Sequence, residues 1–203
     1  FRELRELTTK ENILLIVDEI QTGFGRTGKM FAIENWNVEP DIIVVGKGIA
    51  NGLPLSGVIG KKEVMDKIAK GSVGGTYGGN PVACSVALKA IEILRGEKFL
   101  EKVRKLGKLM FDRLCELKER FEVIGDVRGK GMMLAVELVK DRKTKEPAVD
   151  EVEKLVNKAR EMGLLLLKAG LYGNVIRFHP PLTIEEEVLM EGLDVFEDAL
   201  KSL

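Results

Sequence analysis

Two short apolar runs constrain the fold of this chain more than any other feature. Residues 13–17 (ILLIV) and 42–45 (IIVV) contain only aliphatic side chains, most of them β-branched. An unbroken run of this kind is typical of a strand that is buried on both faces, as in the parallel sheet of an α/β domain. We therefore expect both runs to be strands of a mainly parallel sheet, with a third strand near residues 55–60.

Helical periodicity dominates the following part of the chain. Residues 81–94 read as a helix, because Asn80 is a favourable cap and Pro81 suits the first helical position. Beyond Gly96, apolar residues recur at steps of three and four positions, which predicts a long amphipathic helix. These residues are Leu100, Val103, Leu106, Met110, Leu114 and Leu117.

Shorter strand-like segments follow near residues 123–127, 132–139 and 175–178. Two further helices are expected after Asp150 and Thr183, each with a glutamate three positions on that would complete a capping box. The pattern of apolar residues changes near residue 96, from short continuous runs to a helical period. We therefore expect residues 1–95 to be the last part of a larger α/β domain, and residues 96–203 to form a smaller α+β domain.

The glycines between residues 23 and 28 match two phosphate-binding patterns. Gly23, Gly25 and Gly28 spell G-x-G-x-x-G, and Gly28 with Lys29 almost completes the nucleotide loop G-x-x-x-x-G-K-[ST]. The nucleotide loop fails because Met30 stands where a hydroxyl should bind magnesium. The dinucleotide pattern fails because its first glycine comes too late after the strand, and Lys47 follows the next strand where an acid is required. Both nucleotide interpretations are therefore disfavoured.

Asp18 and Lys47 each stand at the end of an expected buried strand, Asp18 directly after it and Lys47 one glycine later. Ligand sites of open α/β sheets gather at the carboxyl ends of the strands, so one ligand could reach both side chains. A lysine with a desolvated amine can form a Schiff base with an aldehyde cofactor, and pyridoxal phosphate also needs an acid against its pyridine nitrogen. The residues alone leave a structural ion pair at the sheet edge equally open.

Four segments of the chain carry a family resemblance. They are LLIVDEIQTGFGRTGKMFA, PDIIVVGKGIANGLPLSG, GGTYGGNPVACSVAL and VIRFHPPL. In order and spacing they resemble the class III aminotransferases, the group of the 4-aminobutyrate, ornithine and acetylornithine enzymes. The resemblance covers nearly the whole chain. It implies the type I pyridoxal-phosphate transferase fold and pyridoxal 5'-phosphate as cofactor.

The resemblance also implies roles for single residues. It places the Schiff base on Lys47, the pyridine-nitrogen contact on Asp18, and a hydrogen bond near the cofactor's phenolic oxygen on Gln21. Thr76 resembles the threonine that reaches the cofactor phosphate of the neighbouring subunit, and Arg177 the arginine that binds the substrate carboxylate. Without the resemblance, Gln21 could be a turn residue, Thr76 part of an ordinary glycine-rich loop, and Arg177 a surface residue.

The implied reaction moves an amino group between an amine or amino acid, 4-aminobutyrate- or ornithine-like, and a 2-oxo acid. An amino-acid racemase or epimerase with the same cofactor is the alternative, although we identify no second group that could deliver a proton from the opposite face. A non-catalytic dimerising or binding module is also open. The family usually forms homodimers, so we expect a homodimer here.

The resemblance further indicates that the chain covers only the C-terminal portion of an enzyme of this kind. The family's main phosphate-binding turn and the aromatic residue that stacks on the cofactor ring lie upstream of these motifs. The chain also begins at Phe1, as if in the middle of a helix. We therefore expect little activity from these 203 residues alone.

The composition limits the partners and the compartment. Lysine and arginine together number 32, as do aspartate and glutamate, so the net charge is zero and gives no general attraction to nucleic acid or anionic membrane. No apolar run approaches the roughly 20 residues of a membrane span. Cys84 and Cys115 have neither metal nor disulfide spacing, and we assign no metal site. The protein is therefore expected in the cytoplasm.

Overall fold

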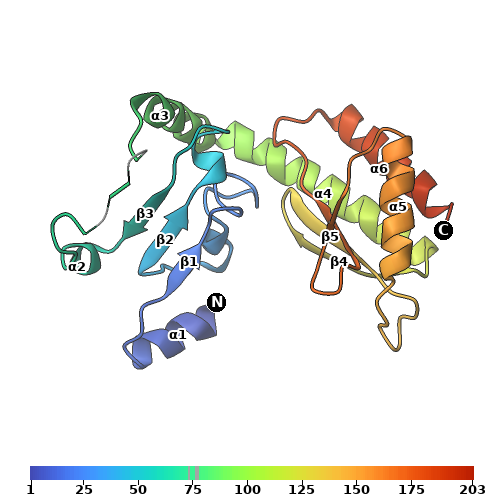
Figure 1. The fold of residues 1–203 in the computed structure, drawn as a ribbon, viewed down its shortest axis with the longest axis horizontal. Helices are drawn as coiled ribbons and strands as arrows, with labels where there is room; N and C mark the ends of the chain where they lie inside the picture. Colours follow the sequence, from blue (N-terminus) through green and yellow to red (C-terminus); the bar gives the residue numbers. More distant parts are fainter. Residues whose placement is uncertain (73, 76–77) are drawn as a thin grey trace. The chain divides into compact units, whose positions relative to one another are not determined.

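The computed structural model describes residues 1–72, 74–75 and 78–203. The chain separates into two compact units, Phe1–Glu101 and Lys102–Leu203, and each is described by itself (Figure 1). The boundary falls between residues 101 and 102, inside the long helix α4 (Glu97–Arg120), rather than between residues 95 and 96. Among the described residues, no helix is long and apolar enough to cross a membrane.

The first unit contains a three-stranded sheet in the order β1-β2-β3. Strands β1 (Ile16–Asp18) and β2 (Ile42–Val45) pair in parallel, whereas β3 (Gly57–Gly60) pairs antiparallel with β2. The two apolar runs are thus neighbouring parallel strands, and the third expected strand is present. Strand β1 is shorter than its apolar run, and Ile16 is 57% exposed, so the prediction of burial on both faces is wrong for β1.

Helical segments precede, separate and follow the strands of this sheet along the sequence. They are α1 (Arg2–Lys10), the 3-10 turns η1 (Ala32–Trp36) and η2 (Lys47–Ile49), α2 (Lys62–Met65) and α3 (Pro81–Arg95). The predicted cap of α3 is confirmed, because Asn80 Oδ1 accepts hydrogen bonds from the amides of Val82 at 2.9 Å and Ala83 at 3.2 Å. The core of the unit joins Phe24, Val45, Leu94 and Leu100.

Asp41 fixes the start of β2 to its neighbours. Its buried carboxylate accepts the amide of Leu15 at 2.8 Å and forms ion pairs with Arg5 at 2.7 Å and Lys61 at 2.9 Å. The Leu15 amide, Lys61 and Arg5 hold the pKa of Asp41 well below its usual range. One carboxylate therefore links α1, the residue before β1, and the residue after β3.

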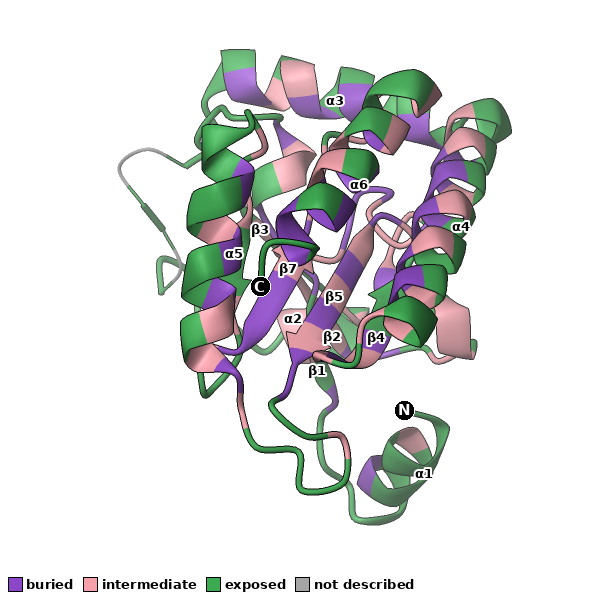
Figure 2. Ribbon diagram, turned by 90° about the vertical axis from the view of Figure 1, so that its right-hand side faces the viewer, coloured by how far each residue is buried: buried purple, intermediate pink, exposed green. Residues whose placement is uncertain are grey.

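The second unit is an antiparallel sheet covered on one face by helices. Its strands lie in the order β4-β5-β7-β6 and comprise β4 (Ile124–Lys130), β5 (Met133–Leu138), β6 (Leu167–Ala169) and β7 (Val175–Phe178). Helices α4, α5 (Val149–Glu161) and α6 (Glu186–Leu200) cover the face that carries the buried residues (Figure 2). Phe178 meets Phe196 edge to face at 5.0 Å between ring centroids.

The caps predicted for α5 and α6 are wrong. Helix α5 begins at Val149 with Ala148 at its N-cap, and α6 begins at Glu186 with Glu185 at its N-cap. Neither N-cap side chain accepts a hydrogen bond from the first amides of its helix. Both helices are amphipathic and bury one face, which stabilises them without a capping box.

Helix α4 approaches the β4–β5 turn very closely at Gly107. A Cβ atom at position 107 would lie 2.5 Å from the carbonyl carbon of Gly131, which is far inside van der Waals contact with rigid backbone. Gly107 therefore sets the distance between α4 and this hairpin.

We predict that Gly107→Ala lowers the free energy of unfolding by about 2 kcal/mol or more, because overpacking outweighs the helix-propensity gain of about 1 kcal/mol. Gly192→Ala in α6 is the matched control, since its Cβ would meet Leu164 at an ordinary 3.6 Å. That control should be neutral or stabilising. Urea unfolding measures both, and equal stability of the two variants would contradict the contact.

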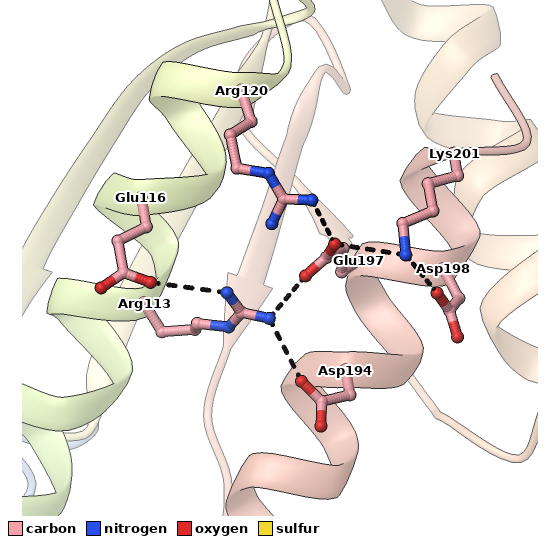
Figure 3. A network of polar contacts seen from close by, with 7 residues as sticks. All are labelled: Arg113, Glu116, Arg120, Asp194, Glu197, Asp198 and Lys201. Atoms are coloured by element: carbon pink, nitrogen blue, oxygen red, sulfur yellow. Dashed lines mark hydrogen bonds and ion pairs between the residues drawn. The ribbon is translucent and has the colours of Figure 1, made fainter.

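Helices α4 and α6 are joined by a network of charges around Glu197 (Figure 3). The Glu197 side chain is 8% exposed and accepts hydrogen bonds from Arg113 and, at 2.6 Å, from Arg120. Lys201 lies 3.2 Å from the same carboxylate. The hydrogen bond from Arg120, followed by that from Lys201, lowers the pKa of Glu197 to about 2.

We predict that Glu197→Gln lowers the free energy of unfolding at pH 7 by about 1–3 kcal/mol, because the paired cations lose a buried partner. Folding lowers the pKa of Glu197 from 4.5 to about 2. Its contribution is therefore present above pH 4.5 and is lost as the pH falls toward 2. Denaturant unfolding of wild type and variant from pH 7 to 2 should show the two stabilities converging.

Asp112→Asn on α4 is the control for charge removal. Asp112 is half exposed and pairs only with Lys108 among the described residues, so its removal should change stability by less than about 0.5 kcal/mol. An equal loss of unfolding free energy in both variants would show that the Glu197 network stabilises the protein no more than an exposed ion pair does.

Candidate active site

The carboxyl ends of β1 and β2 meet at one edge of the first sheet. Asp18, the last residue of β1, lies opposite Val44 of β2, and the next amide, that of Glu19, donates to the Val44 carbonyl at 2.9 Å. Lys47 follows Val44 by three residues and opens η2. The parallel register therefore brings Asp18 and Lys47 to the same edge.

The Asp18 carboxylate is exposed and held by a turn of its own backbone. Its Oδ1 accepts the amide of Ile20 at 2.9 Å. An aspartate that bonds to the amide two residues on forms a local turn, which restricts the rotation of the carboxylate. Asp18 thus presents an oriented acid outside the end of the sheet.

Lys47 lies in a left-handed backbone conformation with φ of 42°, uncommon for a residue other than glycine. The glycines on both sides pack closely against the preceding loop. A Cβ at Gly46 would lie 3.3 Å from Ile20 Cγ2, and one at Gly48 would lie 3.2 Å from Phe24 Cβ. The side chains of Ile20 and Phe24 therefore lie directly against the glycine backbone on either side of Lys47.

The Lys47 side chain itself is exposed. The expectation of a desolvated amine is not met by the described residues of this chain. Exposure leaves the amine accessible to an aldehyde, but the water exclusion that would activate it must come from groups other than these.

The glycine loop after Asp18 uses its amides internally. The amide of Gly23 donates to Glu19, that of Gly25 to Met30 and that of Gly28 to Gly25, all to main-chain carbonyls. Gly25 and Gly28 have φ of 89° and 82°, and Phe24, directly before Gly25, has φ of 56°. The loop is conformationally unusual, as predicted, but these amides do not point outward as a phosphate cradle requires.

Gln21 lies in the turn between Glu19 and Gly23 and is half-buried, three residues beyond Asp18. Arg26 in the same loop is partly buried, and burial lowers the pKa of its guanidinium to about 10. Thr76 lies outside the described residues. The roles inferred for Gln21 and Thr76 therefore stay predictions.

Arg177 belongs to the second unit. It lies on β7 opposite Ala135 of β5 and Leu167 of β6, and it lines a cavity of about 470 Å³. Its Nε is buried and donates to no described residue. A buried guanidinium nitrogen without a partner is costly, so this atom favours an anionic ligand such as a carboxylate.

Glu19 is the site-forming residue that sequence reasoning missed. It is 0% exposed, and its carboxylate accepts the amide of Ile33 at 2.8 Å and the hydroxyl of Thr22. The available signal was a second acid directly after Asp18, followed three positions later by a hydroxyl residue. That pattern alone cannot show that the carboxylate is buried.

Known proteins of similar sequence match nearly the whole of this chain. A leucine/methionine racemase of Thermococcus litoralis is 50% identical over 200 residues, which are 98% of this chain and 45% of the racemase. The 5-aminovalerate aminotransferase DavT of Pseudomonas putida is 46% identical over 202 residues, 100% of this chain and 47% of that protein. This chain thus spans less than half the length of these relatives.

A solved structure shows the same partial fold. The chain superposes with a TM-score of 0.89 and 35% identity on a PLP-bound amine transaminase from an uncultivated Pseudomonas species, covering 99% of this chain and 47% of that one. The expected fold, part of the type I pyridoxal-phosphate transferase fold, is therefore confirmed. The family model described as "Aminotransferase class-III" matches residues 1–200. The chain belongs to the class III aminotransferase family.

Proposed function

We propose that this chain serves in pyridoxal-phosphate-dependent transfer of an amino group between an amine or amino acid, 4-aminobutyrate- or ornithine-like, and a 2-oxo acid. The observation that carries the proposal is the delivery of Asp18 and Lys47 to one edge by the parallel pairing of β1 and β2. Because the chain spans less than half the length of its relatives, it is proposed to act within a longer chain and to have little activity alone.

The residues at this edge fit the cofactor. Lys47 offers an exposed amine for covalent attachment, and Asp18 offers an exposed carboxylate already oriented by Ile20. Pyridoxal phosphate, when bound, supplies the electron sink that makes the α-hydrogen of the substrate acidic.

The chain's own residues then have distinct roles. The Asp18 carboxylate hydrogen-bonds the pyridine nitrogen and keeps it protonated. The Lys47 amine would serve as the general base that holds and moves the proton of the substrate's α-carbon. Gln21 donates to the phenolic oxygen, and Thr76 donates to a cofactor phosphate of the neighbouring subunit.

Arg177 is proposed to bind the substrate carboxylate. Its unpartnered buried Nε supports this role, since a two-pronged donor suits a carboxylate. We also propose a cytoplasmic homodimer, in which Thr76 serves the partner's site. Asp18, Gln21 and Lys47 belong to the first unit, and Arg177 belongs to the second.

A racemase with the same cofactor is the second candidate, and the 50% identity to a leucine/methionine racemase favours keeping it. Racemisation needs a proton from the face opposite Lys47, and we identify no group for that task. Following the stereochemistry of the α-carbon together with oxo-acid formation separates the candidates. Loss of chirality without oxo acid indicates a racemase.

We predict that borohydride reduction of the chain mixed with pyridoxal phosphate labels Lys47 in preference to the other lysines, because Lys47 lies at the same edge of the sheet as an oriented acid. Peptide mass spectrometry gives the site of the adduct. Lys47→Arg is the control and should abolish the specific adduct while the other lysines label as before.

Two results would contradict the cofactor site in this chain: labelling spread evenly over the lysines, or no labelling. Repeating the experiment with a chain extended at its N-terminus to the length of the relatives would then separate two explanations of either result. Specific labelling only in the longer chain assigns the loss to absent cofactor contacts, whereas continued failure rejects the assignment of Lys47.

A further inference from the structure

A buried carboxylate next to Asp18 has no part in the proposed chemistry. Glu19 is 0% exposed, whereas Asp18 is exposed. Consecutive residues at the end of a strand point to opposite sides, so the two acids face different surroundings. Burying an acidic side chain is costly unless its oxygens are hydrogen-bonded, which indicates that Glu19 is held there by specific partners.

The side chain of Glu19 connects two segments of the loop that follows β1. One oxygen accepts the amide of Ile33 at 2.8 Å, at the start of η1, and the other accepts the hydroxyl of Thr22. Both contacts lie on the chain between Asp18 and the end of η1. The carboxylate therefore closes this segment into one compact loop.

The main chain of Glu19 adds two more contacts. Its amide donates to the Val44 carbonyl at 2.9 Å, and its carbonyl accepts the amide of Gly23 at 3.0 Å. A Cβ at Gly23 would lie 2.8 Å from that carbonyl, so only glycine fits there. Gln21 lies inside the turn that this bond closes. Glu19 thus ties the end of β2, the Gln21 turn and η1 to one point.

We propose that Glu19 is a positioning residue that fixes the orientation of the Asp18 carboxylate and of Gln21 without touching cofactor or substrate. The turn held by Glu19 includes Ile20, whose amide is the donor that orients Asp18. Loosening the turn therefore frees Asp18 to rotate. The meaning of this orientation for catalysis rests on the proposed function, but the orientation itself can be measured without cofactor.

Three variants test the proposal by hydrogen exchange of the Ile20 amide, followed by NMR in the cofactor-free chain. Thr22→Val removes one donor to Glu19 and keeps the side-chain shape, and Glu19→Gln removes its charge. Thr27→Val is the matched control, because Thr27 accepts a hydrogen bond from Asn35 at 3.1 Å in the same loop, whereas the described side-chain hydrogen bonds of Glu19 come from Thr22 and Ile33.

We expect Thr22→Val and Glu19→Gln to raise the exchange rate of the Ile20 amide about tenfold, and Thr27→Val to change it less than about twofold. Unchanged exchange in the first two variants would overturn the proposal. So would an equal rise in all three, since the loop would then loosen as a whole. Thr22→Val keeps the test open if Glu19→Gln folds poorly.

A second measurement concerns the cofactor. In the chain mixed with pyridoxal phosphate and left unreduced, the pH dependence of the lysine–cofactor absorbance should shift in Thr22→Val and stay unchanged in Thr27→Val, because Asp18 acts on the pyridine nitrogen only when oriented. If the wild-type chain forms no adduct, the proposed function fails in this chain. The exchange of the Ile20 amide still decides the role of Glu19.

Discussion

The parallel pairing of β1 with β2 is the interaction on which the site depends. Three residue pairs define its register, and the bond from the Glu19 amide to Val44 carries the ladder one residue further. A shift of one residue would reverse the faces of Asp18 and Glu19. The exposed acid would then be buried and the buried acid exposed. The register of β1 against β2 therefore decides which acid is exposed at the edge of the sheet where Lys47 lies.

Local sequence signals predicted much of the fold. The apolar runs marked β1 and β2, Asn80 with Pro81 marked the start of α3, and the period of apolar residues marked α4. The direction of β3 and the three-residue strand β6 were not predicted, because the pairing partner of a strand is set by distant residues. The caps of α5 and α6 failed for a related reason, since packing can start a helix where the best local cap is absent.

The site was predictable in its residue types but not in its environments. Asp18 and Lys47 could be found because each follows a strand, and the family resemblance then supplied their roles. Whether Lys47 is desolvated, or Glu19 buried, depends on what the rest of the fold places over them. Neither property leaves a periodic trace in the sequence, and both had to come from the structure.

The two buried glutamates show different ways of keeping a carboxylate inside a protein. Among the described contacts, Glu19 accepts from an amide and a hydroxyl, whereas Glu197 is surrounded by cations. Added salt distinguishes the parts of the Glu197 network, because dissolved ions screen exposed pairs far more than buried ones. Its outer carboxylates, Asp194 and Asp198, are exposed, so added salt will weaken their ion pairs. The ion pairs of the buried Glu197 carboxylate will persist. The C-terminal helix should therefore remain attached to α4 at high ionic strength.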